Sequence, residues 1–258
     1  MQPSSRGVLY PDRLPVFHRL VPSGAAADVV RWIWISEWDV PPGEVSRQHL
    51  IGFPALNLVV EHDMVGLSGP STRTSYRDLV GTGWAVAALL HPAAVCTLTA
   101  DPRRLRDRYV PMDLPDLHRS IAPLEPTDAG RQRAADVLAA WVVSTVGPLG
   151  PEAVLANRMV ELAGSDESLL RVPELADRLG TSERKLQRLA ARYVGLTPAA
   201  LIRRRRLQEA AERLRSEPRI DLATLATELG YADQSHLTND FARLLGFSPG
   251  DYRRTAAG

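Results

Sequence analysis

Two short segments in the last third of the chain carry side chains that can recognise DNA bases. One segment holds Arg184, Lys185 and Arg188, and the other holds Gln234 and Asn239. In the major groove of DNA, Arg or Lys can hydrogen-bond to guanine O6 and N7, and Gln or Asn can hydrogen-bond to adenine N6 and N7. Any one of these residues would more often belong to a solvated helix face, above all in a chain with thirty arginines. The sequence around them therefore has to decide between the two interpretations.

Both segments are embedded in copies of one pattern. The motif LADRLG at residues 175–180 recurs as LATELG at 225–230. Further on, GLTP at 195–198 recurs as GFSP at 246–249. A repeat of this length indicates two similar structural units in series.

Each copy has the element order of a helix-turn-helix unit. A short apolar helix is expected at 172–179 and again at 222–229, each ended by a left-handed glycine. Ser182 and Asp233 are then expected to cap a second helix. Helical spacing turns the apolar residues of each second helix inward and its polar residues outward. In the first copy, the residues expected to face inward are Leu186, Leu189, Ala190 and Tyr193, and those expected to face outward are Arg184, Lys185, Gln187 and Arg188. In the second copy, the inward residues are Leu237, Phe241, Leu244 and Leu245, and the outward residues are Gln234, Ser235, Thr238 and Asn239.

A long helix is expected between the copies, from Pro198 to about residue 215. At about 1.5 Å per residue, this helix spans about 27 Å. Such a rod can hold two recognition helices near the roughly 34 Å that separates successive major-groove turns on one face of B-DNA. One copy of the chain can then read two adjacent groove segments.

Basic residues concentrate in the same region. Residues 178–215 contain eleven Arg or Lys and three Glu, in a chain whose net charge is +1. Such a concentration attracts the phosphate backbone of nucleic acids. The four arginines at 203–206 are ambiguous, because consecutive helix positions point in different directions and cannot all reach one phosphate backbone. Two of the four are expected to contact DNA or acidic neighbours.

Residues 153–254 resemble the DNA-binding domain of the AraC/XylS family of transcriptional regulators, in which two helix-turn-helix units are joined by a long helix. The resemblance is carried by IDLATLATELGYADQSHLTNDF at 220–241, by GFSP at 246–249, and by Tyr252 and Arg253. It implies that the partner is double-stranded DNA.

The resemblance also implies which residues bind DNA. Arg184 and Arg188 take base-reading positions, and His236 lies against phosphate. Asn239 stands where the family commonly has Arg, so a strong guanine contact is not expected there. The full implied set is Ser182, Arg184, Lys185, Arg188, Gln234, Ser235, His236, Thr238 and Asn239.

The first part of the chain has a different pattern. Short strand-like runs at 29–35, 55–60, 84–90 and 95–98 are separated by Gly, Pro and Asp. They predict a β-rich domain over residues 1–125. This region resembles, less specifically, the uncharacterised β-rich N-terminal domains of some AraC/XylS regulators. Many family members sense a small molecule with a cupin-like barrel, which makes such a barrel one form that the domain can take.

The expected fold class is α+β, with a β-rich domain followed by an all-α domain. An amphipathic helix at 127–146 is expected within a linking or dimerisation segment, residues 126–150. Residues 151–258 then form the double helix-turn-helix domain. This division leaves two alternatives for the N-terminal half: it senses a ligand, or it only dimerises.

Three tryptophans at 32, 34 and 38 fall on one face of an extended strand, where they line a cavity or, as we favour, fill the core. No catalytic or metal-binding group is expected. His49, His62 and His91 lie far apart in sequence, and Cys96, the only cysteine, sits in an apolar run with no adjacent base. We therefore expect a buried thiol, no disulfide, no cofactor and no enzyme activity.

The composition is that of a globular protein, with 258 residues, 45% of them hydrophobic. No run approaches 18 apolar residues, and the first residues lack the layout of a signal peptide. A cytoplasmic protein that does not enter membranes is expected. Besides DNA, the candidate partners are a small-molecule effector, RNA polymerase and a second copy of the chain.

Overall fold

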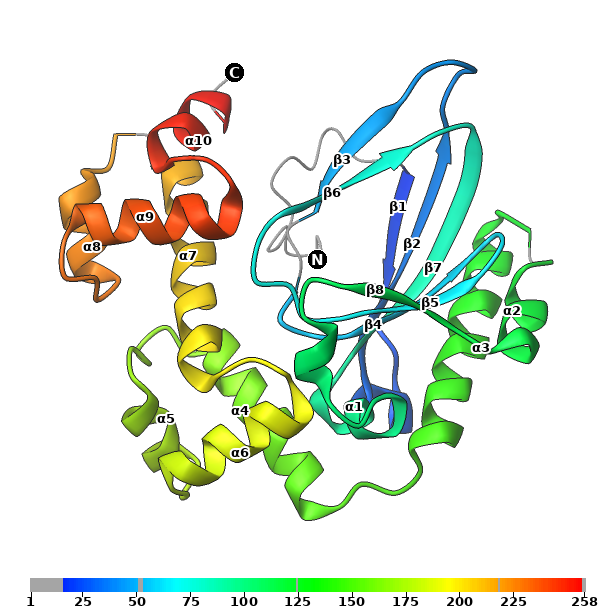
Figure 1. Ribbon diagram of the computed structural model, residues 1–258, viewed down its shortest axis with the longest axis horizontal. Coiled ribbons are helices and arrows are strands. Elements are labelled where there is room, and N and C mark those ends of the chain that lie inside the picture. The colour runs from blue at the N-terminus through cyan, green and yellow to red at the C-terminus, as the bar shows by residue number, and fades with distance from the viewer. Residues whose placement is uncertain (1–15, 51–52, 124, 218, 257–258) are drawn as a thin grey trace.

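The computed structural model describes residues 16–50, 53–123, 125–217 and 219–256. It has the expected α+β class, with a β-rich N-terminal half and a helical C-terminal half (Figure 1). The first residues of the chain, in which we found no signal peptide, lie outside the described ranges. The described strands are β1 (Val16–Leu20), β2 (Val30–Asp39), β3 (Ser46–Leu50), β4 (Asn57–Glu61), β5 (Val65–Ser68), β6 (Ser75–Leu79), β7 (Thr82–Leu90) and β8 (Tyr109–Met112).

The strands form an antiparallel sheet with the order β1-β2-β7-β4-β5-β8, and β3 pairs separately with β6. Its two longest strands, β2 and β7, pair with each other, with Ile35 opposite Val86. Three expected strands, 29–35, 55–60 and 84–90, are confirmed as β2, β4 and β7.

The fourth expected strand, 95–98, is wrong. Its residues belong to helix α1 (Pro92–Leu98), in which Pro92 occupies the first turn. Proline is favoured there because its missing N–H would have no intrahelical partner. The periodicity of a short apolar run does not distinguish a buried strand from a buried helix. Here the alanines and the proline that precede the run favour the helix.

The two faces of the sheet bury different residues. Ile33, Ile35 and Val86 face a core that includes residues of α1, α2 (Pro115–Ile121) and α3 (Asp128–Val146). Trp34 and Trp38 lie on the opposite face, half-buried against a small cluster formed by Val59, Ala85 and Ala87. Trp32 packs edge-on against Phe53, with ring centroids 5.1 Å apart. The three tryptophans therefore share one face, as expected, and contact other side chains there.

Helix α3 packs against the sheet of its own chain. Its residues Ala134, Leu138 and Val142 are buried in the first core. Arg131 forms a bidentate ion pair with Glu37 of β2, at 2.7 Å for the shorter bond. The helix thus fastens the end of the N-terminal half before the chain enters the C-terminal half.

The C-terminal half consists of short helices arranged around one long helix, α7. In Figure 1, α7 runs from the group α4, α5 and α6 to the group α8, α9 and α10. No helix in the described part of the chain is both long and apolar enough to cross a membrane. The helices are α4 (Pro151–Ser165), α5 (Val172–Arg178), α6 (Glu183–Tyr193), α7 (Pro198–Ser216), α8 (Leu222–Glu228), α9 (Gln234–Leu245) and α10 (Pro249–Ala256).

Helix α7 contributes to two separate cores. Its first turns place Leu201 and Ile202 in the core of α4, α5 and α6. Its later turns place Leu207, Ala210 and Leu214 in the core of α8, α9 and α10. The four arginines at 203–206 lie on the helix between these two apolar sets.

The two halves of the chain are in contact. Ala93 of α1 belongs to the core of α4, α5 and α6. The Arg106 side chain, just after a 3-10 turn (Pro102–Leu105), donates a hydrogen bond to the Gly195 carbonyl. The first group of C-terminal helices is therefore built partly on the N-terminal half.

Candidate nucleic-acid interface

The two turns of the repeat have the geometry that the sequence predicts. Gly180 and Gly230 follow α5 and α8 with φ angles of 61° and 71°, in the left-handed region that favours glycine. The Ser182 hydroxyl accepts a hydrogen bond from the Lys185 N–H, and the Asp233 carboxylate accepts one from the His236 N–H. Both caps are confirmed, so the first unit (α5 and α6) and the second unit (α8 and α9) are helix-turn-helix units.

Helix α6 buries Leu186, Leu189 and Ala190 and exposes its charged face. Arg184 and Arg188 are exposed, and Lys185 is half-buried. Arg184 forms no hydrogen bond or salt bridge with any described residue, so its guanidinium is free for a ligand. The structure thus places both expected arginines of the first unit on the solvent side of α6.

Arg188 already has a partner. Its guanidinium donates to the Glu152 carboxylate at 3.1 Å, and Arg192 donates to the other oxygen of the same carboxylate at 3.1 Å. Glu152 lies in the first turn of α4, 36 residues before Arg188. Sequence spacing gave no signal for this contact, because it depends on how α4 and α6 pack.

The residues of α9 that the sequence predicts to contact bases are uncharged, and the exposed Arg243 follows them in the last turn, paired with Asp240. Gln234, Ser235 and Asn239 are exposed, and Thr238 is half-buried. The exposed His236 ring stands edge-on to Tyr231, with centroids 5.1 Å apart. The Asn239 amide makes no hydrogen bond with the described residues, so neither Asp240 nor the backbone holds it away from solvent.

The four arginines at 203–206 contact other residues of the same chain. The buried Arg204 donates to the Ser71 carbonyl in the N-terminal half at 2.9 Å, and burial lowers its pKa to about 10. The acidic neighbours expected for two of the four are present for Arg203 and Arg205. The contacts are Arg203 with Asp240 at 3.8 Å, Arg205 with Glu209 and the Leu169 carbonyl at 2.8 Å each, and Arg206 over the Tyr231 ring at 3.9 Å.

Asp240, to which the sequence pattern assigns no role, contacts residues of both α9 and α7. It is buried, and its Oδ1 accepts a hydrogen bond from Arg243 at 2.9 Å besides the contact with Arg203. The buried Leu237, Phe241 and Leu245 set the rotation of α9, and this rotation leaves Asn239 on the exposed side.

Cys96 lies at the junction of the two halves. Its side chain is half-buried, and Sγ lies 3.7 Å from the Arg192 carbonyl at the end of α6. Burial raises the pKa of the thiol, which keeps it protonated and unreactive at neutral pH. Among the described residues, no three His, Cys, Asp or Glu side chains gather as a metal site would require. The side chain of His49 lies outside the described set.

Residues 175–255 match the family described as a helix-turn-helix domain, and residues 18–111 match a domain of unknown function, DUF6597. An AraC-like transcription regulator described from Streptomyces antibioticus is 33% identical over 126 residues, which are 48% of this chain and 39% of that protein. The transcriptional activator RhaS of Escherichia fergusonii is 37% identical over 81 residues, 31% of this chain and 28% of RhaS. The chain therefore spans less than half the length of these two relatives.

Two further comparisons concern shorter or more distant proteins. The transcriptional activator AarP of Providencia stuartii is 28% identical over 105 residues, 41% of this chain and 77% of AarP. The crystal structure of ToxT from Vibrio cholerae superimposes with a TM-score of 0.41 at 10% identity, over 94% of this chain and 97% of ToxT. Together with the confirmed pair of helix-turn-helix units on one long helix, the sequence matches show that the C-terminal half of this chain is similar to AraC-like transcription regulators.

Proposed function

We propose that this protein is a transcription regulator that binds double-stranded DNA in a sequence-specific manner. The observation that carries the proposal is the pair of recognition helices, α6 and α9, joined through one long helix and each exposing its polar face. A helix with such a face can enter the major groove, where base edges present distinct patterns of donors and acceptors. Two of them on one chain can read two successive groove segments.

The two helices take different parts in binding. On α6, Arg184 and Arg188 contact guanine edges, while Lys185 and the cap residue Ser182 contact the backbone. On α9, the amides and hydroxyls read bases, and His236 lies against phosphate. The residues of α9 proposed to contact bases are Gln234, Ser235, Thr238 and Asn239. This assignment rests on the exposure of Gln234, Ser235 and Asn239, on the place of the half-buried Thr238 beside them, and on the chemistry of all four side chains.

The N-terminal half is proposed to receive a signal. Residues 1–125 act as the sensor of a small-molecule effector, residues 126–150 link it to the DNA-binding domain, and residues 151–258 bind DNA. The contact of α1 with the first group of C-terminal helices supports this coupling, because a ligand that shifts one side of a packed interface biases the other. RNA polymerase and a second copy of the chain remain proposed partners, and the cytoplasm the proposed location.

The alternative, in which the N-terminal half only dimerises, had α3 as its candidate surface. The apolar side of α3 faces the sheet of its own chain, and its exposed positions include Gln132, Arg133 and Asp136. That arrangement leaves α3 no second apolar face for another copy. Ligand sensing is therefore the proposal that we favour.

Selection of bound sequences from randomised duplex DNA tests the function with the full chain. We expect an enriched site with two recognised parts about 10 base pairs apart, one helical turn of DNA. Gln234→Ala should weaken base preference in one part, at the base that Gln234 contacts, and leave the other part unchanged. Arg133→Ala, an exposed arginine on α3, is the control and should leave the site unaltered. Failure to enrich any sequence would contradict the proposal.

A further inference from the structure

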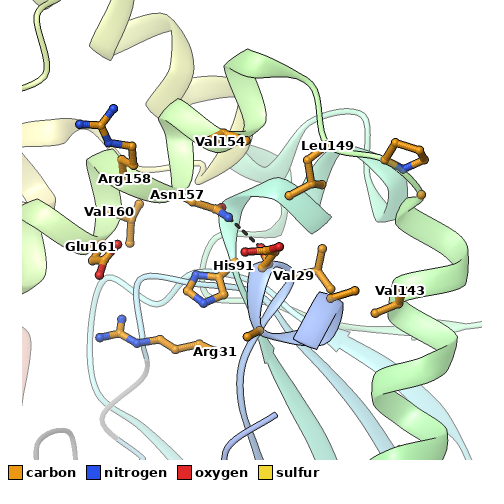
Figure 2. Close-up of a pocket in the computed structure, with 15 residues that line it drawn as sticks. Val29, Arg31, His91, Val143, Leu149, Val154, Asn157, Arg158, Val160 and Glu161 are labelled. Carbon is orange, nitrogen blue, oxygen red and sulfur yellow. Dashed lines mark hydrogen bonds between the residues drawn. The ribbon is translucent and has the colours of Figure 1, made fainter. Parts of the chain in front are cut away.

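A cavity of about 680 Å³ lies where the two halves of the chain meet. Its walls come from both halves: the 3-10 turn before β2 (Gly24–Asp28), the start of β2, the end of α3, the linker at 147–150 and one side of α4. Figure 2 shows the labelled side chains around it. This volume falls within the roughly 300–1,000 Å³ of small-molecule sites.

The cavity has a charged end and an apolar end. In Figure 2, Arg31, His91 and Glu161 gather on one side. Val143 and Leu149 line the other side, near α3 and the linker. An occupant with one polar head and an apolar body matches this division.

The charged end holds a cation, Arg31, and an anion, Glu161, that are not joined by a hydrogen bond. Neither the Arg31 guanidinium nor the Glu161 carboxylate forms a side-chain hydrogen bond or salt bridge with the described residues, although the charge of Glu161 acts on Arg31 and on His91. The Arg31 guanidinium lies over the Trp32 ring at 5.0 Å, which fixes its position on one side. Burial, and then the charge of Arg31, lower the pKa of His91, so that its imidazole is neutral at pH 7. A head group that satisfies this end must therefore offer both an acceptor for Arg31 and a donor for Glu161.

The cavity also borders the contact that ties the two halves together. The Asn157 amide of α4 donates to the Asp28 carbonyl at 2.7 Å and accepts from the Ala93 N–H at 2.8 Å. Asn157 thus joins α4 both to the turn before β2 and to α1. An occupant of the cavity would press on these same elements, and so on the placement of the first helix-turn-helix unit.

We propose that this cavity binds a small zwitterion with an apolar body, of the kind that a free hydrophobic amino acid represents. Its carboxylate pairs with Arg31, its ammonium group with Glu161, and its side chain extends toward Val143 and Leu149. The regulatory consequence of binding rests on the proposed function, whereas binding itself does not. A simple carboxylate would place a second negative charge beside Glu161, and a simple amine would place a second positive charge beside Arg31, so that neither engages both groups.

Isothermal titration calorimetry with the full chain and three matched probes tests the proposal. The probes are L-phenylalanine, 3-phenylpropanoate, which lacks the ammonium group, and phenethylamine, which lacks the carboxylate. We expect L-phenylalanine to bind at least about tenfold more tightly than either analogue, since a hydrogen bond to a charged group contributes about 1.5–3 kcal/mol. Equal or tighter binding of 3-phenylpropanoate would overturn the zwitterion assignment. No binding of L-phenylalanine, L-leucine or L-tryptophan at millimolar concentrations would overturn the site.

Two variants separate the roles of the charged residues. Glu161→Gln should weaken L-phenylalanine about tenfold and leave 3-phenylpropanoate unchanged or tighter, because the unfavourable negative charge is gone. Arg31→Gln should weaken both carboxylates. Arg158 also borders the cavity, but Figure 2 shows its guanidinium directed away from the other charged groups, so Arg158→Gln should change neither. An effect of Arg158→Gln as large as that of Arg31→Gln would contradict the placement of the carboxylate.

The same preparations distinguish this inference from the proposed function. Calorimetry contains no DNA, so its outcome does not depend on DNA binding. Ligand binding without any selected DNA site would contradict the proposed function and support the cavity assignment. A selected DNA site with no ligand binding would contradict the cavity assignment alone.

Discussion

The two helix-turn-helix units share one sequence pattern, but their hydrophobic cores are formed by different parts of the chain. The core of the first unit extends beyond the C-terminal half, because Ala93 of α1 is buried in it and Cys96 packs against it. The core of the second unit is formed by residues 207–252, including Phe241 and Tyr252. A sequence repeat thus specifies local geometry, whereas the contacts that support each copy are decided elsewhere in the chain.

The recognition helices of the two units also differ, in the charge of the side chains that they expose. The first unit presents Arg184, Lys185 and Arg188, and the second presents amides and hydroxyls. Charged groups supply attraction to phosphate that does not depend on sequence, while neutral groups act mainly by base contact. The unit with the charges is also the unit that is built on the N-terminal half. A signal received there is therefore placed to act first on the charged unit.

The largest expected effect tests the separation of the cores. Phe241→Ala removes a fully buried ring from the second unit and should cost about 3–5 kcal/mol of folding free energy. Because that core is formed within residues 207–252, α8, α9 and α10 should unfold while the rest stays folded. Hydrogen exchange measured by mass spectrometry should show lost protection confined to the second unit.

The matched change in the first unit is Leu189→Ala, also at a buried position. It should cost about 2–5 kcal/mol. Here the loss of protection should spread to α1, since the core is shared. Confinement of the effect to α5 and α6 would show that the two units are supported alike, and the comparison would fail.

The repeat could be predicted from the sequence because turns and caps are local. Gly180, Gly230, Ser182 and Asp233 each act on neighbouring residues, and the helices begin and end within one or two residues of the expected positions. The expected burial of Leu186 and the residues that share its face follows from periodicity alone.

What could not be predicted depends on contacts between distant segments. The helix α1 was mistaken for a strand because a short apolar run fits both. The ion pair of Arg188 with Glu152, and the docking of Arg204 on Ser71, join segments separated by 36 and 133 residues. The junction cavity arises from the same kind of packing, so its charged residues carried no recognisable spacing.

The next expected effect concerns α6, the recognition helix with the charged side chains. Arg184→Ala should weaken binding to the selected DNA site by about 1–3 kcal/mol, because it removes a base contact made by a side chain with no other partner. Fluorescence anisotropy at fixed salt measures the change. Arg133→Ala removes the same charge far from α6 and should have no effect. Equal losses on specific and random DNA would show that Arg184 contacts phosphate and does not read a base.

A smaller effect is expected at Glu152. Its carboxylate holds Arg188 and Arg192, and an exposed ion pair contributes about 1 kcal/mol or less. Glu152→Gln should therefore release both arginines, remove a negative charge near the DNA and tighten binding by about 0.5–1 kcal/mol. Glu125→Gln, at an exposed site before α3, is the control for net charge. If Glu152→Gln binds no more tightly than this control, Arg188 does not depend on release from Glu152.

The smallest expected effect sharpens the contrast between the two faces. Asn239→Arg places a longer, charged side chain on α9. The native Asn reaches less far toward the bases than Arg and brings no charge to the DNA. Binding should tighten by about 0.5 kcal/mol, since the new contact is offset by the cost of ordering a flexible side chain.

A shift in base preference is the more telling result of the same substitution. The Asn239 amide is exposed and makes no hydrogen bond with the described residues, and the buried Leu237 and Phe241 set the rotation of α9 that leaves it exposed. An arginine at this position should therefore favour guanine in the part of the site that α9 reads, and leave the part read by α6 unchanged. Selection from randomised DNA with both proteins measures this directly. Identical profiles would show that position 239 faces away from the bases, and that the neutral face of α9 reads DNA through Gln234, Ser235 and Thr238 alone.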